Sequence, residues 1–389
     1  MLQRLDSVII IGAGVSQLPI IQIAKNKGYK IIAIDQNPEA PGFKYVDVSL
    51  IISTYKTEKV MKKLENLFKE YNYVSIICRT SGKALYTAAA VAEKFSLNGL
   101  SKEIVPLATE KSQLRMFCDN NDLPMPRGVR VNATQNKKLE FQFPVIVKPD
   151  LPVFGKKDIA VIWNDNDIPN AISAACESSG NGYAEIEEYI EGIDVSALFH
   201  LNNGQSEMIT YWDELVALDN DNAIIGLGVS VPSVIDGAAI KGQIEKIISR
   251  FSSHFINIEA LMILSFRIGM GGIINIIELH ADLGGDLIAD QLFPKANSTF
   301  DFFEMAVQLS LGENKMDASP DFKPTALIYN KSKYETPDHQ NYEISGDHFF
   351  FKNKSQIDNH TNLFKLFKSC NNIRSIPQHY QWLIQYREK

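Results

Sequence analysis

A few basic residues in an otherwise apolar part of the chain are the first candidates for chemistry. Lys148 stands near the end of the apolar run 143–149, and a lysine there needs a reason because an unpaired buried charge is unfavourable. A segment with Gly155 and Lys157 separates this run from the next apolar strand, 159–163. Such a hairpin is typical of a mobile cover over a phosphate, but it also suits an exposed turn with surface lysines.

Acidic residues gather in two places farther along the chain. The segment 185–192 has four carboxylates among its first seven residues, a pattern that a solvated strand edge would also show. After the predicted strand 273–277, Glu278, His280 and Asp282 stand at alternate positions. Carboxylate oxygens suit Mg²⁺, whereas a histidine nitrogen suits zinc and other transition metals better. For His280 three interpretations stay open, namely a metal ligand, a substrate contact and structural filling.

Glycines open the chain's first strand–turn–helix unit. Gly12 and Gly14 follow the buried run 8–11, and an apolar-periodic stretch begins at Leu18. The third glycine of the dinucleotide-binding pattern is absent because Leu18 and Pro19 stand in its place. These residues leave two interpretations open: a cofactor site, or a sharp turn that needs glycine for its geometry.

Strands that alternate with helices position these residues. Further buried strands are expected at 30–34 and 74–78, with a charged helix at 58–71 between them. Strands in this alternation predict an α/β fold with a parallel sheet. A helix is expected over 107–120, and the two prolines of 122–126 end it.

Composition narrows the class of protein. A length of 389 residues suits two or three domains. With 39 basic and 46 acidic residues the net charge is -7, so nucleic acid and membrane surfaces are not expected partners. The four cysteines are scattered without a Cys-x-x-Cys pair, and the N-terminus has no long apolar segment. These features favour a cytoplasmic protein.

Taken together, these segments resemble the ATP-grasp superfamily of carboxylate–amine ligases, with similarity to biotin carboxylase and to the large chain of carbamoyl-phosphate synthase. The resemblance runs in order from Val8 to about Gly312 and is carried by the segments 10–17, 35–41, 108–111, 144–149, 187–192 and 277–285. It implies a Rossmann-like domain at 1–105, an ATP-grasp domain at 106–312 with a lid at about 130–190, and a small α+β extension at 313–389. The glycine turn would then contact the acceptor substrate rather than NAD.

The resemblance also implies which residues hold ATP between the lid and the larger part of its domain. Lys111 and Lys148 match the two lysines that contact the phosphates. The hairpin with Gly155 and Lys157 matches the phosphate cover, although Pro152, Val153 and Phe154 replace a serine- and glycine-rich run and should stiffen it. Four further positions match residues for the nucleoside: Glu187 for the adenine amino group, Tyr189 and Ile190 for the adenine edge, and Asp194 for the ribose.

The expected metal site departs from the family pattern. The family supplies two acidic residues about a dozen positions apart, followed by an asparagine and an arginine. Glu278 matches the second acid and His280 the asparagine, while the first acid falls at Ser265 or Phe266. Asp282 replaces the arginine, and Arg267 is the candidate for the cation that steadies an acyl phosphate. Mg²⁺ is the implied ion, with Mn²⁺ as an alternative.

The implied activity is that of an ADP-forming ligase that joins a small-molecule carboxylate, such as an amino acid, to an amine through an acyl phosphate. A homodimer is also implied, because dimers are common in the family. The altered metal ligands support a second hypothesis, a catalytically impaired relative that binds a nucleotide or metabolite as a regulatory module. A third hypothesis, with less support than the other two, is an NAD-dependent dehydrogenase that binds its cofactor at the glycine turn.

Overall fold

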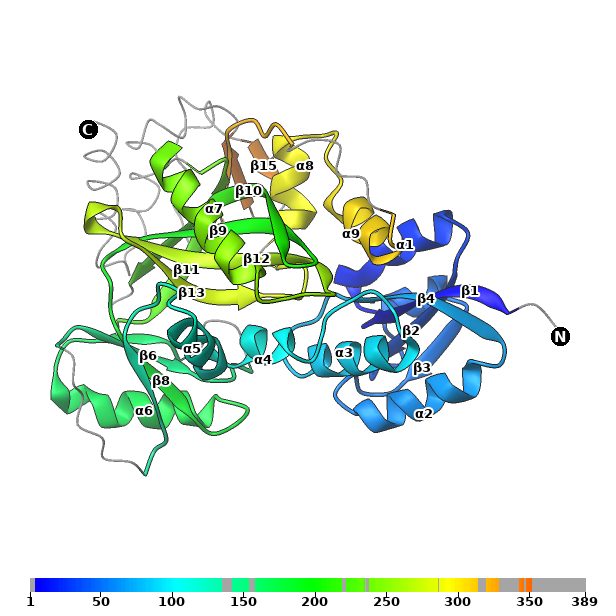
Figure 1. Cartoon of the computed structure of the whole chain (residues 1–389), viewed down its shortest axis with the longest axis horizontal. Helices are drawn as coiled ribbons and strands as arrows, with labels where there is room; N and C mark the ends of the chain where they lie inside the picture. Colours follow the sequence, from blue (N-terminus) through cyan, green and yellow to red (C-terminus); the bar gives the residue numbers. More distant parts are fainter. Residues whose placement is uncertain are drawn as a thin grey trace.

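A computed structural model of the chain describes residues 4–134, 142–153, 158–218, 222–233, 235, 238–285, 287–313, 320–328, 343–345 and 348–351. Gly155, Lys157 and the helix expected at 362–368 lie outside these residues. Within them, no helix is long and apolar enough to cross a membrane. Figure 1 shows two smaller lobes beneath a larger central sheet.

The N-terminal lobe is a parallel sheet covered by helices. Its strands lie in the order β3 (Val48–Ile51), β2 (Lys30–Asp35), β1 (Leu5–Ile11) and β4 (Tyr71–Cys78). The β-branched residues of β1 are fully buried because helices cover both faces of the sheet. The helices of this lobe are α1 (Leu18–Asn26), α2 (Thr57–Leu67) and α3 (Ala84–Phe95). The predicted α/β architecture with a parallel sheet is thus confirmed.

The second small lobe, which we call the lid, is an antiparallel sheet with one helix. Its strands lie in the order β5 (Gly128–Val131), β8 (Ala184–Glu188), β6 (Val145–Pro149) and β7 (Ala160–Ile162). Alternate residues point to opposite faces, and one face packs its apolar side chains against α6 (Ile168–Glu177). The opposite face carries Lys148, Glu185 and Glu187, so strand periodicity places these charged residues together.

The central sheet has eight described strands. Their order is β13 (Ile274–His280), β12 (Glu259–Gly269), β9 (Gly192–Asn202), β10 (Gln205–Leu218), β11 (Ile224–Val231), β14 (Thr325–Ile328), β16 (His348–Phe351) and β15 (Glu343–Ser345). On one face, Phe199 and Phe266 pack in a core with α7 (Ala238–Ser252). The opposite face packs against η5 (Ile288–Leu292), α8 (Phe293–Ala296) and α9 (Phe302–Ser310).

The helix predicted over 107–120 is two helices, α4 (Ile104–Thr109) and α5 (Lys111–Asn120). They separate at Glu110, whose backbone is extended. The first N–H groups of a helix have no hydrogen-bond acceptor within the helix. In α5 they donate to Asp150, the residue that follows β6. Its carbonyl accepts from the N–H of Lys111 at 3.0 Å, and its carboxylate accepts from the N–H of Ser112 at 2.8 Å. Lys111 therefore lies at the start of a helix that is tied to the lid.

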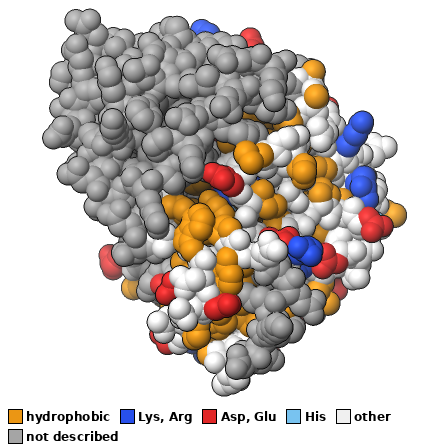
Figure 2. Space-filling view, turned by 90° about the vertical axis from the view of Figure 1, so that its left-hand side faces the viewer, with side chains coloured by type: hydrophobic (Ala, Val, Ile, Leu, Met, Phe, Trp, Pro, Cys, Tyr) orange, Lys and Arg blue, Asp and Glu red, His pale blue; other side chains and the backbone are white. Residues whose placement is uncertain are grey.

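Apolar side chains also reach the surface. Met270 and Ile273, at the turn between β12 and β13, are 67% and 66% exposed. On the face in Figure 2, apolar side chains lie among acidic and basic ones. This mixture is ordinary for a protein surface.

Candidate active site

Two cavities meet between the lid and the β12–β13 end of the central sheet. The smaller has an empty volume of about 630 Å³, and the larger, about 1460 Å³, reaches the N-terminal lobe at Ser81 and Gly82. Lys111 and Glu278 line both cavities. The smaller cavity also brings together most of the predicted nucleotide residues, namely Lys148, Glu187, Tyr189, Ile190 and Asp194, and with them the predicted catalytic cation, Arg267.

Lys111 and Glu278 are in contact where the two cavities join. The ammonium group of Lys111 donates to Glu278 Oε1 at 3.3 Å. The lysine is buried, whereas the side chain of Glu278 is 38% exposed. The contact therefore places a cation and a carboxylate at a position that both cavities can reach.

Lys148 and Glu187 form an ion pair on the inner face of the lid. Arg115, from α5, adds ion pairs with Glu185 and Glu187, each at 2.8 Å. Burial would raise the pKa of Glu187, but Lys148 and Arg115 outweigh it, so the net pKa lies below its usual value. Burial raises the pKa of Glu185 to about 7, despite the opposing effect of Arg115. Glu187 is thus held as a carboxylate between two cations.

Asp194 and Arg267 form the wall of the smaller cavity at the central sheet. They are direct cross-strand partners on β9 and β12. The guanidinium of Arg267 donates to both carboxylate oxygens of Asp194, with 2.8 Å between Nη2 and Oδ2. Its remaining terminal nitrogen donates to the carbonyl oxygen of Ile190 at 3.0 Å. The expected contact of Arg267 with an acyl phosphate stays a prediction.

The structure distinguishes the two positions considered for the missing acidic ligand. Ser265 is the direct cross-strand partner of Glu278, whereas Phe266 is fully buried in the core beneath α7. The hydroxyl of Ser265 lies 2.8 Å from that of Ser196, which donates to Glu214 Oε1 at 2.7 Å. A neutral hydroxyl therefore stands where a second carboxylate would face Glu278.

The protein donors near Glu278 are few for a metal ion. His280 Nε2 lies 3.7 Å from Glu278 Oε2, and both side chains are partly exposed. Among the described residues, no group of three or more His, Cys, Asp or Glu side chains could hold a metal. Mg²⁺ prefers six oxygen ligands, so these residues do not form a magnesium site by themselves. An ion here would take most of its ligands from a nucleotide and water.

Sequence reasoning missed Glu214, which lies on the wall of the larger cavity. It stands on β10, beside the buried Asp213 that points to the opposite face and accepts from Ser230 at 2.8 Å. Two adjacent acids in a run of apolar and aromatic residues are the same kind of signal that marked Lys148. Arg115 was also missed, because a charged residue on a helix is unremarkable in sequence.

Two loop segments border the larger cavity. The hairpin that contains Gly155 and Lys157 is described only at its ends, where Pro152 and Val153 line the larger cavity. Asp282 also lines this cavity, and its carboxylate accepts from the N–H of Gly284 at 3.3 Å. Because residues 154–157 lie outside the described residues, the phosphate-covering role of the hairpin stays a prediction.

The glycine turn of the N-terminal lobe is filled by a side chain. Gly12 has a φ of +96°, a conformation that favours glycine. The amide of Gln17 packs against Gly12 and donates to the carbonyl oxygen of Arg79 at 2.6 Å. The guanidinium of Arg79 pairs with Asp290 and donates to the carbonyl oxygen of Ser16. Asp290, in the first turn of η5, therefore connects two lobes.

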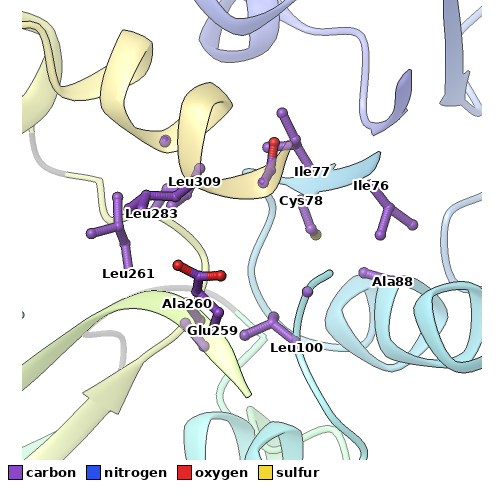
Figure 3. A pocket seen from close by; sticks show the side chains of 14 residues that line it. Ile76, Ile77, Cys78, Ala88, Leu100, Glu259, Ala260, Leu261, Leu283 and Leu309 are labelled. Atoms are coloured by element: carbon purple, nitrogen blue, oxygen red, sulfur yellow. The ribbon is translucent and has the colours of Figure 1, made fainter. Parts of the chain in front are cut away.

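A third cavity, of about 580 Å³, lies between the N-terminal lobe and the central sheet. Figure 3 shows that aliphatic side chains such as Ile76, Leu100 and Leu261 line it, with Glu259 as the labelled carboxylate. Burial raises the pKa of its cysteine, Cys78, to about 12, so the thiol stays protonated near neutral pH. This cavity offers packing rather than reactive groups.

Comparison with known proteins supports the fold. No family model and no curated protein matches the chain. Solved structures do resemble the chain, and the three described here each match it with a probability of 1.00. The L-amino acid ligase from Bacillus licheniformis has a TM-score of 0.72 at 14% identity, covering 96% of this chain and 100% of that one.

Two further structures agree. The N5-carboxyaminoimidazole synthetase from Staphylococcus aureus, complexed with ADP, has a TM-score of 0.69 at 17% identity and covers 93% and 97% of the two chains. The biotin carboxylase domain of Hydrogenobacter thermophilus 2-oxoglutarate carboxylase, in complex with MgADP, has a TM-score of 0.66 at 14% identity, covering 96% of this chain and 92% of that chain. The chain thus has the fold of ATP-grasp ligases, as the sequence resemblance implied.

Proposed function

We propose that the protein is an ATP-dependent, ADP-forming carboxylate–amine ligase. A substrate carboxylate oxygen attacks the γ-phosphorus of ATP; a new O–P bond forms, the bond to the β-phosphate oxygen breaks, and ADP leaves. An amine nitrogen then attacks the carbonyl carbon of this acyl phosphate. The new C–N bond replaces the C–O bond to phosphate, and the nitrogen loses a proton; an acceptor bound as an ammonium group gives up one further proton before the attack.

The observation that carries this proposal is the junction of two cavities at Lys111 and Glu278. A nucleotide in the smaller cavity would have its adenine at Tyr189 and Ile190 and its phosphates between Lys111 and Lys148. Its terminal phosphate would then reach the larger cavity, where the acceptor has room. The ammonium groups of the two lysines suit a polyanion, because each is a compact charge on a flexible stem.

The charge of the larger cavity supports an acceptor that carries an amine. Glu214, Glu278 and Asp282 line it, and Lys111 is the one lysine or arginine among its described lining residues. Arg79, at the end of β4, is directed to Asp290 instead. A cationic ammonium group would be attracted to this wall.

The second candidate is a relative that binds nucleotide without turnover. It is favoured by the hydroxyl of Ser265 at the position of the expected acid and by the small number of metal donors near His280. Glu278 and His280 remain our proposed metal contacts, with Mg²⁺ or Mn²⁺ as the ion. The cytoplasmic location and the homodimer also remain proposals.

The test is ADP and phosphate release across a panel of amino acids, with mass spectrometry of the product and an ATP thermal-shift titration. The ligase predicts ATP stabilisation and acceptor-dependent ADP release, with Lys111→Met weakening both. ATP stabilisation without turnover for any acceptor supports the second candidate. If ATP neither stabilises the protein nor is consumed, both proposals are wrong.

The acceptor charge is tested separately. Amine-bearing acceptors are compared with analogues of the same size in which a hydroxyl replaces the amine. The amine should be preferred, and Glu214→Gln should reduce that preference while leaving ATP binding unchanged. Equal use of both analogues by the wild-type protein would contradict an acidic recognition wall.

A further inference from the structure

One side chain connects the two parts of the smaller cavity that would recognise the nucleoside. Arg267 holds the carboxylate of Asp194, the proposed ribose contact, through two nitrogens. Its third nitrogen holds the carbonyl oxygen of Ile190, which belongs to the proposed adenine contact. These bonds join the strand β9 and the segment that precedes it to β12.

The connection is buried and tightly packed. Arg267 is 6% exposed and Asp194 is 8% exposed. The guanidinium carbon lies 5.5 Å from the ring centre of Tyr189. Gly192 allows β9 to approach β12 closely, because a Cβ at this residue would lie 2.1 Å from the carbonyl oxygen of Ile268. Burial would lower the pKa of Arg267, but Asp194 raises it above its usual value, so the side chain stays charged.

We propose that Arg267 is a positioning residue for the nucleotide, and not the cation that contacts the acyl phosphate. The proposal rests on the nucleotide site of the proposed function. All three guanidinium nitrogens of Arg267 already donate to protein oxygens, and the fixed planar fork holds those oxygens in one geometry. Each carboxylate oxygen of Asp194 has a second lone pair that can accept from a ribose hydroxyl. Arg267 would thus orient Asp194 for the ribose and Ile190 for the adenine at once.

If Arg267 has this role, its replacement should weaken two nucleotide preferences at once, whereas replacement of a residue that contacts only one part of the nucleoside should weaken one. Arg267→Gln should weaken both the preference for ATP over GTP and the preference for ATP over 2′,3′-dideoxy-ATP. Asp194→Asn should weaken only the second preference. Arg267→Gln should bind ATP roughly ten- to hundredfold more weakly, while turnover at saturating ATP, where the wild type shows any, stays close to wild type.

The experiment measures dissociation constants for the three nucleotides by calorimetry. Arg267→Lys keeps the charge but cannot hold both oxygens and the carbonyl, so it should restore ATP affinity only in part. Arg127→Gln is the matched control, because this arginine also pairs with a carboxylate, that of Glu188, but has a side chain that is 71% exposed. The control should bind all three nucleotides as the wild type does.

If Arg267→Gln does not fold, the double variant Asp194→Asn with Arg267→Gln removes both charges and is compared with Asp194→Asn alone. A further loss of the ATP-over-GTP preference supports the proposal, and no further loss overturns it. The proposal is also overturned if Arg267→Gln keeps its nucleotide preferences, or keeps ATP affinity and loses turnover. A wild-type protein that binds none of the nucleotides would instead overturn the proposed function itself, and this inference with it.

Discussion

Ser265 and Glu278 face each other directly across β12 and β13. Ser265 is the start of a hydrogen-bonded row that continues through Ser196 on β9 to Glu214 on β10. The described part of the sheet therefore has Glu214 at one end of this row and Glu278 beside the hydroxyl at its other end. The arrangement separates two acidic groups that a compact metal site would need to hold close together.

The first prediction restores an acid beside Glu278. In Ser265→Asp, a second hard oxygen donor faces Glu278, so the concentration of Mg²⁺ needed for half-maximal ADP formation, or for ATP stabilisation if turnover is absent, should fall severalfold. The measurement is a Mg²⁺ titration of each signal. Ser253→Asp adds the same charge at an exposed serine and should leave the titration unchanged. An unchanged titration for Ser265→Asp would show that the metal does not lie at this strand pair.

The second prediction separates the phosphate contact of Lys148 from its structural one. Lys148→Met should weaken ATP binding tenfold or more and lower the thermal midpoint, because Glu187 loses one of its two buried cations, at a cost of up to ~3 kcal/mol. In the double variant Lys148→Met with Glu187→Gln, the thermal midpoint should return most of the way to the wild-type value, whereas ATP affinity should stay low. Lys94→Met, at a lysine that is 52% exposed and paired with Glu65, serves as the control. Recovery of ATP affinity in the double variant would contradict a phosphate contact.

The third prediction concerns pH and follows from Glu185. Its pKa is about 7 in the folded protein against 4.5 for an ordinary glutamate. Between these values the folded protein binds a proton that the unfolded chain releases, so stability falls as pH rises through this window and levels off above it. The change is at most ~3 kcal/mol for a shift of this size.

Thermal midpoints from about pH 5 to about pH 8 test this slope. Glu185→Gln should flatten it, because the amide does not titrate. Glu188→Gln, on the same strand but partly exposed, should keep the wild-type slope. Equal slopes in the wild type and Glu185→Gln would mean that Glu185 does not carry the proton.

Strand periodicity is the part of the site that sequence predicts best. Lys148 and Glu187 lie on the inner face of the lid because alternate positions of β6 and β8 supply its apolar core. The same rule would have identified Glu214, whose neighbour Asp213 points to the other face. Tertiary contacts decided the rest: Asp150 starts a new helix at Lys111, and Arg115 reaches the lid from that helix. Local sequence does not encode such partners.

Long-range pairs were beyond sequence reasoning for the same reason. Asp290 and Arg79 are 211 positions apart, and their contact depends on how the lobes pack. Arg267 and Asp194 are 73 positions apart, and only strand register makes them partners. Arg267, the predicted cation for an acyl phosphate, thus pairs in the structure with the proposed ribose contact.

The most direct test of the account is a crystal structure of the protein with an ATP analogue and Mg²⁺. We expect the adenine beside Tyr189 and Ile190 and the ribose hydroxyls at Asp194. The phosphates should lie between Lys111 and Lys148, with the terminal phosphate nearest to Glu278. A nucleotide bound in a different cavity, or with its phosphates directed away from Lys111 and Glu278, would contradict the account.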